Sequence, residues 1–276
     1  MRVKVNGISI EYELQGEPGR PVVTLSHSLA TCMQMWRPQV SALAEHFQVL
    51  LYDMRGHGES DAPAGPYSIE TLAEDVEGLW DALGIQQSYF AGLSVGGKIG
   101  LMLARRCPKR VRGLILCNTA GRIPPEARAV WDERIAQVLA GGMESQREVT
   151  LRRWFTDGFR AANPDTMAWI GGLILATPPQ GFIGCSRAIQ DFDYMEGLWP
   201  IKTPVLLLPG EKDSGTPPAD SEAIRERVPA ARLTLVPNAA HLSNIEQPGF
   251  VTDAMLEFLL ELEASAPALT SRFTTF

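Results

Sequence analysis

Cysteine and histidine are both scarce in this chain, with four of each among 276 residues. Disulfide frameworks and structural zinc sites depend on CxxC spacings or on cysteines grouped with paired histidines. Neither grouping is present, so we expect buried, reduced thiols and no metal site. The four cysteines are Cys32, Cys107, Cys117 and Cys185.

Long apolar runs and an excess of positive charge are also missing. No apolar stretch approaches the roughly 20 residues that cross a bilayer, and residues 1–6 lack the apolar core of a signal peptide. Lys and Arg number 25 against 32 Asp and Glu, which gives a net charge of -7. Because phosphate backbones are bound by clustered basic side chains, a nucleic-acid partner is not expected. The composition favours a cytoplasmic protein without a membrane partner, and it leaves the oligomeric state open.

Strand and helix patterns alternate along most of the chain, as in sheets whose parallel strands are joined by helices. Short apolar runs suit strands that helices cover on both faces. A hairpin is predicted over residues 2–16, around the tight turn of Asn6-Gly7. The sequence therefore predicts an α/β fold with a mostly parallel central sheet. Strands are expected at 21–26, 47–52, 88–91, 111–117, 204–208 and 233–236, and helices at 37–46, 69–83, 98–106, 218–228 and 250–262.

The alternation stops between about residues 121 and 194. Helical patterns follow one another there without an intervening strand, at 125–139, 144–155, 164–176 and 181–190. Such a block predicts a helical cap inserted over one end of the sheet, and a bundle that only buries a sheet edge is the alternative. We expect a core of residues 1–120 and 195–264, a cap of residues 121–194, and a C-terminal tail of residues 265–276 without periodicity.

Residues 92–96 read Gly-Leu-Ser-Val-Gly, with an apolar run before them and an amphipathic run after them. This context places Ser94 at a sharp strand-to-helix turn, where the flanking glycines allow the two backbones to approach each other. A serine on such a turn presents its hydroxyl above the sheet and is suited to attack an acyl carbon. The alternative is a serine in an ordinary turn.

A nucleophilic serine needs a base to take its proton and an acid to fix the tautomer of that base. His241 is the best candidate base, because it follows the last predicted strand in a loop of small residues. His46 closes a predicted surface helix, and His57 is expected to be a structural residue of its turn. A histidine bonded in a surface loop is the alternative for His241.

The acid should leave the preceding strand, whose carboxyl end lies beside the turn of Ser94. That strand continues into Glu211-Lys212-Asp213, which supplies two carboxylates. We choose Asp213, with Glu211 in reserve and a solvated loop acid as the alternative. Its role is to accept the Nδ1 proton of His241 and to stabilise the imidazolium. The order serine, aspartate, histidine along the chain is the one expected on this architecture.

Attack on a carbonyl group also generates an oxyanion, which needs two backbone donors. The amide of Val95 is expected to supply one, since it lies at the amino end of the helix that follows Ser94. The loop after strand 21–26 should supply the other, and we choose the amide of Leu29. His27 lies in the same loop, directly after the strand.

These residues resemble those of the α/β-hydrolase superfamily over nearly all of residues 5–262, and more narrowly those of 3-oxoadipate enol-lactonases. This chain has His27, Ala30 and Val95 where those enzymes have Asn, Gly and Met. The narrower resemblance lies in Leu25-Ser26-His27-Ser28-Leu29-Ala30-Thr31 before Met35-Trp36, in Gly92-Leu93-Ser94-Val95-Gly96-Gly97, in Cys117-Asn118-Thr119-Ala120, in Arg153-Trp154-Phe155-Thr156 and in Ala240-His241-Leu242-Ser243-Asn244-Ile245-Glu246.

The resemblance implies an α/β-hydrolase fold that hydrolyses a five-membered enol lactone carrying a carboxymethyl group. The product would be 3-oxoadipate, in the catabolism of aromatic compounds. The implied mechanism is an acyl-enzyme on Ser94 with general acid and base catalysis by His241. It requires no metal and no organic cofactor.

A carboxylated substrate also calls for a cation in the pocket. Arg134, Arg152 and Arg153 lie in predicted cap helices, where a solvated helix face is the expected position of each. Trp131 and Trp154 either wall the pocket or fill the cap core. Candidates for contact with the substrate are His27, Trp131 and Trp154.

Two further readings of the sequence stay open. The same triad serves a carboxylesterase, a carbon–carbon bond hydrolase or a perhydrolase, which differ in oxyanion geometry and in cap shape. A protein that binds a ligand without turning it over is the other reading. A broken triad would mark that second class, and all three predicted triad residues are present in this sequence.

Overall fold

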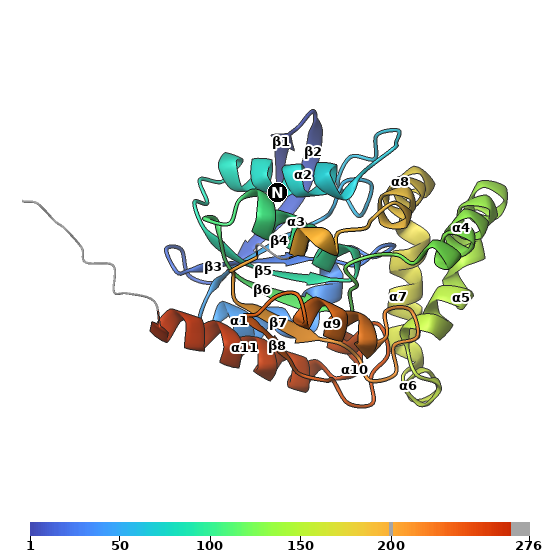
Figure 1. Ribbon diagram of the computed structural model, residues 1–276. Coiled ribbons are helices and arrows are strands. Elements are labelled where there is room, and N and C mark those ends of the chain that lie inside the picture. Colours follow the sequence, from blue (N-terminus) through green and yellow to red (C-terminus); the bar gives the residue numbers. More distant parts are fainter. Residues whose placement is uncertain (199–200, 266–276) are drawn as a thin grey trace, which may run out of the picture.

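An eight-stranded, mostly parallel sheet runs through the centre of the molecule (Figure 1). The computed structural model describes residues 1–198 and 201–265, so the predicted tail lies outside the described residues from position 266 onward. The strand order is β1-β2-β4-β3-β5-β6-β7-β8, in which β2 is antiparallel to both its neighbours and every later pair is parallel. The strands are β1 Arg2–Val5, β2 Ile8–Gln15, β3 Val22–Ser26, β4 Gln48–Tyr52, β5 Ser88–Leu93, β6 Val111–Cys117, β7 Val205–Leu208 and β8 Ala231–Leu233.

Helices cover both faces of this sheet. The helices α2 and α3 pack together on one face, and α1 and α11 pack together on the other (Figure 1). This arrangement confirms the α/β fold class that the alternation predicted. The core helices are α1 Arg37–Ala44, α2 Ile69–Ala82, α3 Val95–Arg106, α9 Pro218–Arg225, α10 Ser243–Glu246 and α11 Pro248–Ser265.

Short local signals set the ends of two of these elements. Asn6 and Gly7 join β1 to β2 with φ angles of 47° and 79°, the positive values that a tight hairpin turn needs. The Ser68 hydroxyl accepts a hydrogen bond from the Thr71 amide at 3.1 Å and caps α2. The predicted hairpin and the predicted start of this helix are both confirmed.

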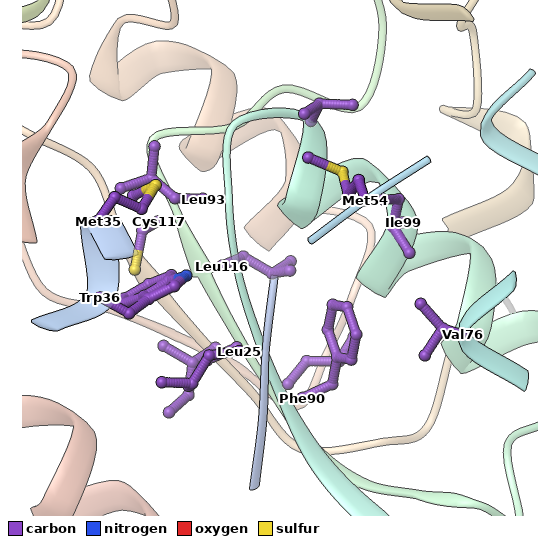
Figure 2. Close-up of a cluster of buried hydrophobic side chains, with 14 of the residues drawn as sticks. Leu25, Met35, Trp36, Met54, Val76, Phe90, Leu93, Ile99, Leu116 and Cys117 are labelled. Carbon is purple, nitrogen blue, oxygen red and sulfur yellow. The ribbon is translucent and has the colours of Figure 1, made fainter. Parts of the chain in front are cut away.

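The central strands lie in the hydrophobic core. Every residue of β5 is buried, as a strand covered on both faces requires. Figure 2 shows the surrounding cluster, in which Phe90 and Leu93 of β5 meet Leu116 of β6, Ile99 of α3 and Val76 of α2. Close packing of this kind leaves little room for movement, so the carboxyl end of β5 is a rigid support for the residue that follows it.

A block of helices stands at one end of the sheet (Figure 1). The chain enters and leaves this block through an antiparallel bridge between Arg122 and Asp193. The exact bounds predicted for the cap, residues 121 and 194, stay a prediction. Among the described residues, no helix is both long enough and apolar enough to cross a membrane. The helices of the block are α4 Arg128–Gly141, α5 Glu144–Trp154, α6 Asp157–Ala162, α7 Pro164–Ala176 and α8 Pro179–Gln190.

Two elements differ from the sequence prediction. The strand expected at 233–236 is β8, Ala231–Leu233, and it lies earlier in the chain. Thr234 and Val236 still donate hydrogen bonds to Leu207 and Pro209, so the apolar run follows β7 without forming a regular ladder. The short helix α6 was not predicted, and it begins where the Thr156 hydroxyl accepts from the Phe159 amide at 3.3 Å.

Candidate active site

Ser94 lies between β5 and α3 in a strained turn. Its φ and ψ angles are 58° and -113°, a region that residues other than glycine rarely adopt. A Cβ atom on Gly92 would lie 2.2 Å from the Gly96 carbonyl oxygen, and a Cβ atom on Gly96 would lie 2.4 Å from the Ser26 carbonyl oxygen. Glycine is therefore required at both flanks of the motif, because only glycine lets α3 approach the strands this closely.

Hydrogen bonds from the end of β6 hold this turn in place. The Ser94 amide donates to the Cys117 carbonyl at 2.9 Å, and the Thr119 hydroxyl donates to the Ser94 carbonyl at 2.7 Å. Asn118 lies between these two partners and reaches the other half of the site. The position of Ser94 is thus linked to the loops that follow β7 and β8.

His241 and Asp213 form a buried pair at the same edge of the sheet. Asp213 follows β7 and His241 follows β8, so neighbouring strands deliver the two side chains. Nδ1 of His241 donates to Oδ2 of Asp213 at 2.7 Å, and their side chains are 8% and 0% exposed. This hydrogen bond leaves Nε2 of the neutral ring as the atom that can take a proton.

The carboxylate of Asp213 is saturated with donors. Oδ1 accepts from the amides of Gly215 and Thr216 at 2.8 and 3.1 Å, and Oδ2 accepts from the Thr216 hydroxyl at 2.7 Å. Burial by itself raises the pKa of Asp213, but the charge of His241 and the hydrogen bonds to the carboxylate outweigh it and lower the pKa to about 2. An ionised carboxylate is therefore held against the imidazole, where it fixes the tautomer and favours the imidazolium.

Asn118 is a part of this cluster that the sequence analysis quoted in a motif but did not assign to the site. Its Nδ2 donates to Asp213 Oδ2 at 2.9 Å and to the Ala240 carbonyl at 3.1 Å, while its Oδ1 accepts from the Ser243 hydroxyl at 2.5 Å. Its φ angle of 47° is one that asparagine tolerates better than most residues. Its position directly after the central strand β6 was the signal that could have found it.

Two glutamates hold the loop that carries His241. Glu211, the reserve candidate for the acid, is exposed and accepts from the Asn238 amide at 2.8 Å, so it supports the turn and does not contact the imidazole. Glu246 is buried; it accepts from the Ala240 amide at 2.6 Å and from the Thr156 hydroxyl at 2.7 Å. Glu246 thereby joins the His241 loop to the helical block.

The predicted serine and histidine both follow strands at one edge of the sheet. Within residues 1–198 and 201–265, no hydrogen bond joins the Ser94 hydroxyl to the ring of His241. The indole of Trp154 in α5 stacks on the imidazole of His241, with ring centroids 6.4 Å apart and an interplanar angle of 23°. The ring of His241 thus has its carboxylate partner at the Nδ1 edge and an indole from the helical block on one face.

The two amides predicted to bind an oxyanion come from the loops after β3 and β5. Val95 opens α3, so its amide lies at the positive end of the helix dipole. In the described part of the chain, neither the Val95 amide nor the Leu29 amide donates a hydrogen bond to another residue. Both donors are therefore available, as an oxyanion site requires.

Two buried histidines brace the loop that carries Leu29. His57 Nε2 accepts from the Ala30 amide at 3.1 Å, and Nδ1 of His27 donates to the Ser28 carbonyl at 2.8 Å. His27 Nε2 also accepts from the Met54 amide at 2.9 Å, so no polar atom of its fully buried ring is left for the predicted contact with a substrate. Burial lowers the pKa of both histidines, to about 4 for His57, so both rings are neutral near pH 7.

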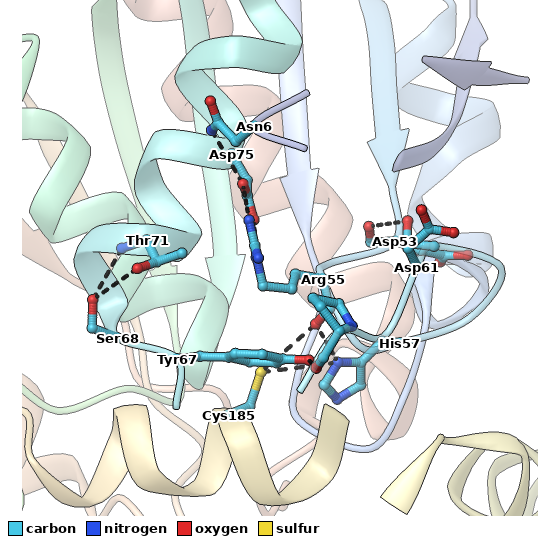
Figure 3. A network of polar contacts seen from close by, with 12 residues as sticks. Asn6, Asp53, Arg55, His57, Asp61, Tyr67, Ser68, Thr71, Asp75 and Cys185 are labelled. Atoms are coloured by element: carbon cyan, nitrogen blue, oxygen red, sulfur yellow. Dashed lines mark hydrogen bonds and ion pairs between the residues drawn. The ribbon is translucent and has the colours of Figure 1, made fainter. Parts of the chain in front are cut away.

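Figure 3 shows how the His57 turn is attached to the rest of the core. His57 Nδ1 lies 3.2 Å from the Arg55 carbonyl, and the Arg55 guanidinium forms an ion pair with Asp75 of α2 at 2.7 Å. Cys185 of α8 lies against the same turn. The role predicted for His57, a structural residue of its turn, agrees with these contacts.

The three cap arginines occupy different environments. Arg152 is exposed and pairs with Glu148 at 2.8 Å, as a solvated helix face predicts. Arg153 is half-buried; burial lowers its pKa, and the nearby negative charge of Asp213 opposes that shift in part. Arg134 is only 7% exposed, so the solvated position expected for it is wrong. Its guanidinium lies 4.8 Å from the ring centroid of Trp131, which places Trp131 beside a buried cation.

Comparison with known proteins agrees with this architecture. The family model described as alpha/beta hydrolase fold matches residues 21–248. The chain belongs to this alpha/beta hydrolase family. The strand-to-helix turn of Ser94 is the feature of that fold that carries a nucleophile.

Individual relatives within this family resemble the chain over most of its length. 3-Oxoadipate enol-lactonase 2 of Acinetobacter baylyi is 35% identical over 87% of this chain and 89% of its own length. The crystal structure of the enol-lactonase from Burkholderia xenovorans LB400 has a TM-score of 0.91 and 39% identity, covering 94% of this chain and all of that one. A protein of Azorhizobium caulinodans that carries the name carbamate hydrolase RutD is 31% identical over 91% of this chain and 95% of its own length. The resemblance to 3-oxoadipate enol-lactonases is confirmed.

Proposed function

We propose that this protein is a hydrolase acting on ester bonds, with Ser94, His241 and Asp213 as its catalytic triad. The observation that carries the proposal is the buried hydrogen bond between His241 and an ionised Asp213, at the sheet edge where Ser94 is held in its strained turn. No other described histidine combines a carboxylate partner with a ring nitrogen left over for a serine. Catalysis of this kind needs the base to be oriented before the substrate arrives.

The substrate that we propose is a small enol lactone carrying a carboxylate, of the 3-oxoadipate enol-lactone type. Two relatives named as enol-lactonases support this choice, since each covers most of the chain. His241 would take the proton of the Ser94 hydroxyl as the Ser94 oxygen attacks the lactone carbonyl, and the amides of Leu29 and Val95 would receive the developing oxyanion. Collapse of the tetrahedral intermediate breaks the ring C–O bond and leaves the acyl group on Ser94, while the imidazolium of His241 protonates the enol oxygen.

The second half of the reaction uses the same residues in reverse. His241 would take a proton from water, the resulting hydroxide adds to the acyl carbon, and the protonated ring returns the proton to the Ser94 oxygen as the acid leaves. Asp213 stays ionised throughout and stabilises the imidazolium at each step. The proposed substrate is a small molecule, and we propose that the protein acts on it in the cytoplasm.

An assay that follows the ultraviolet absorbance of an enol lactone, alongside a panel of aryl esters, tests the substrate assignment. We expect rapid loss of the enol-lactone absorbance in the wild-type protein and none above background in Ser94→Ala. Hydrolysis of simple aryl esters without loss of the enol-lactone absorbance would contradict the lactonase assignment. That result would make the protein a carboxylesterase with the same triad.

A further inference from the structure

The backbone amides on both sides of His241 are hydrogen-bonded. The Ala240 amide donates to Glu246 Oε2 at 2.6 Å, and the Leu242 amide donates to the Trp154 carbonyl at 3.1 Å. Trp154 is the last residue of α5, and its indole also stacks on the imidazole of His241. The helical block therefore contacts the proposed base through its ring and through the amide that follows it.

Glu246 connects the amide that precedes His241 to the same helical block. Its Oε1 accepts from the Thr156 amide at 3.0 Å and from the Thr156 hydroxyl at 2.7 Å, while its Oε2 accepts from the Ala240 amide. The residue is only 6% exposed, and a buried carboxylate is costly unless hydrogen bonds replace its hydration. In the described part of the chain, Ala240 and Thr156 supply all the hydrogen bonds to this carboxylate.

Only a carboxylate can make both connections of Glu246. The three groups that face it are N–H or O–H donors, and both of its oxygens accept. A glutamine has one accepting oxygen and one amino group, so it would place a donor against either Ala240 or Thr156. The charge also strengthens each of these hydrogen bonds. Glu246→Gln therefore breaks one connection without changing the size of the side chain.

The short helix α10, which ends at Glu246, is itself attached to the core. The Ser243 hydroxyl donates to Asn118 Oδ1 at 2.5 Å, and Asn244 Nδ2 donates to the Met35 carbonyl at 3.0 Å. Asn118 also holds the Ala240 carbonyl at 3.1 Å. Because α10 is fixed by the core, Glu246 is a fixed acceptor against which the loop of the base is held.

We propose that Glu246 is a positioning residue for His241, which fixes the Ala240 peptide against Thr156 and so makes the helical block part of what aims the base at Ser94. This inference rests on the proposed function, because it requires His241 to be the base. The hydrogen bonds of Glu246 reach no triad side chain within the described residues, so it acts through the backbone. Proton transfer depends steeply on the placement of the base.

Steady-state hydrolysis of 4-nitrophenyl acetate by Glu246→Gln tests this role. We expect kcat to fall by about 30-fold, because a misplaced base slows both the formation and the hydrolysis of the acyl-enzyme. KM should change by no more than about twofold, since both steps slow together. The rate at which a fluorophosphonate labels Ser94 should fall by a factor similar to that for kcat.

Thr156 breaks the same connection from the other side. Thr156→Val removes the hydroxyl that donates to Glu246 and should lower kcat by about fivefold, while Thr156→Ser keeps the hydroxyl and should restore most of that rate. The double variant of Glu246→Gln and Thr156→Val should be no slower than Glu246→Gln, because the two residues act as one unit. These variants also test the inference if Glu246→Gln does not fold.

Glu211→Gln is the matched control, because Glu211 holds the same loop through a single donor, the Asn238 amide at 2.8 Å. Glutamine keeps an oxygen for that donor, so kcat should not change. Urea unfolding of each variant confirms that the assays compare folded proteins.

Three results would overturn the positioning role of Glu246. They are an unchanged kcat in both Glu246→Gln and Thr156→Val, a rise in KM at constant kcat, and a loss of equal size in Glu211→Gln. A wild-type protein that hydrolyses no ester and is not labelled at Ser94 would instead remove the proposed function on which this role rests. The two failures are therefore distinguishable.

Discussion

The carboxylate of Asp213 and the guanidinium of Arg134 are both buried charges, yet their surroundings are opposite. Asp213 accepts hydrogen bonds from two backbone amides, two neutral side chains and His241. Arg134 has one side-chain partner and two buried nitrogens without any in the described chain. The carboxylate at the core edge is therefore hydrogen-bonded on both oxygens, whereas the guanidinium in the helical block is hydrogen-bonded only through Nε within the described residues.

This difference separates a buried charge that its neighbours hold in place from one that they do not. Proton transfer needs groups that are fixed in advance, and a fully satisfied buried network is rigid. A buried charge without a counter-ion instead lowers stability, because its lost hydration is not replaced. The comparison therefore predicts that substitutions in the two regions act on different quantities.

The largest effect is expected from removing the negative charge of Asp213, whose carboxylate is fully hydrogen-bonded. Asp213→Asn should lower kcat by about 10⁴-fold, because an amide no longer fixes the tautomer or stabilises the imidazolium. Glu211→Gln is the matched control, since Glu211 contacts the Asn238 amide and not the imidazole. Steady-state kinetics on one aryl ester measures both, and a loss in Glu211→Gln that equals the loss in Asp213→Asn would mean that the wrong carboxylate was assigned.

The loop that carries the Leu29 amide is also held by internal hydrogen bonds, among them the one from the Ala30 amide to His57. The pH dependence of stability tests the contribution of His57. Burial lowers the pKa of His57 to about 4, below its ordinary value of 6.5, so the unfolded chain binds more protons between these values. The stabilisation by neutral His57 is therefore complete above pH 6.5 and is lost as the pH falls toward 4, by on the order of 3 kcal/mol. His57→Gln keeps an acceptor for the Ala30 amide but does not titrate.

Denaturant unfolding between pH 7 and pH 4 measures this difference. The free energy of unfolding should fall more steeply with decreasing pH in the wild type than in His57→Gln. Comparing the two proteins removes the contribution of Asp53, whose pKa burial raises to about 6 and which acts in the opposite direction. Parallel pH profiles for the two proteins would show that His57 does not act in this way.

A smaller effect is expected where one donor of the Asp213 network is removed. Asn118→Ala deletes the hydrogen bonds to Asp213 and to the Ala240 carbonyl and leaves the Ser243 hydroxyl without its acceptor. We expect the free energy of unfolding to fall by about 2 kcal/mol and kcat to fall about tenfold. Thermal unfolding and ester kinetics measure the two changes, and an unchanged melting temperature would argue against a tightly coupled network.

The smallest effect is expected from replacing Arg134, and its effect on the free energy of unfolding should have the opposite sign. Arg134→Met replaces a buried cation, whose Nη1 and Nη2 have no hydrogen-bond partner among the described residues, by an apolar side chain of similar length. Such a change should leave the free energy of unfolding unchanged or raise it by about 1 kcal/mol. A loss comparable to that of Asn118→Ala would show that Arg134 is paired within the protein, and the contrast between the two regions would then disappear.

The parts of the molecule that sequence could predict are those set by local signals. The turn of Ser94 follows from the two glycines that flank it, and the start of α2 follows from Ser68. The position of β8 was wrong by two residues because Leu233 to Val236 is apolar, while the ladder with β7 is set by Ala231 and Arg232.

Long-range contacts explain what sequence could not predict. Asn118 joins the site through residues about a hundred positions away, and nothing local to Cys117-Asn118-Thr119 records that distance. Arg134 occupies a helix whose polar residues looked solvated, but the neighbouring helices α5 and α8 cover it. Both failures concern burial by partners that are distant in the sequence.

The central claim is that Ser94 forms a covalent acyl intermediate with the help of His241. Treatment of the intact protein with a fluorophosphonate, followed by mass spectrometry of the whole chain and of its peptides, tests it most directly. The account predicts a single adduct on Ser94 that is absent in Ser94→Ala and forms far more slowly in His241→Ala. An unmodified protein, or an adduct on another residue that persists in Ser94→Ala, would contradict it.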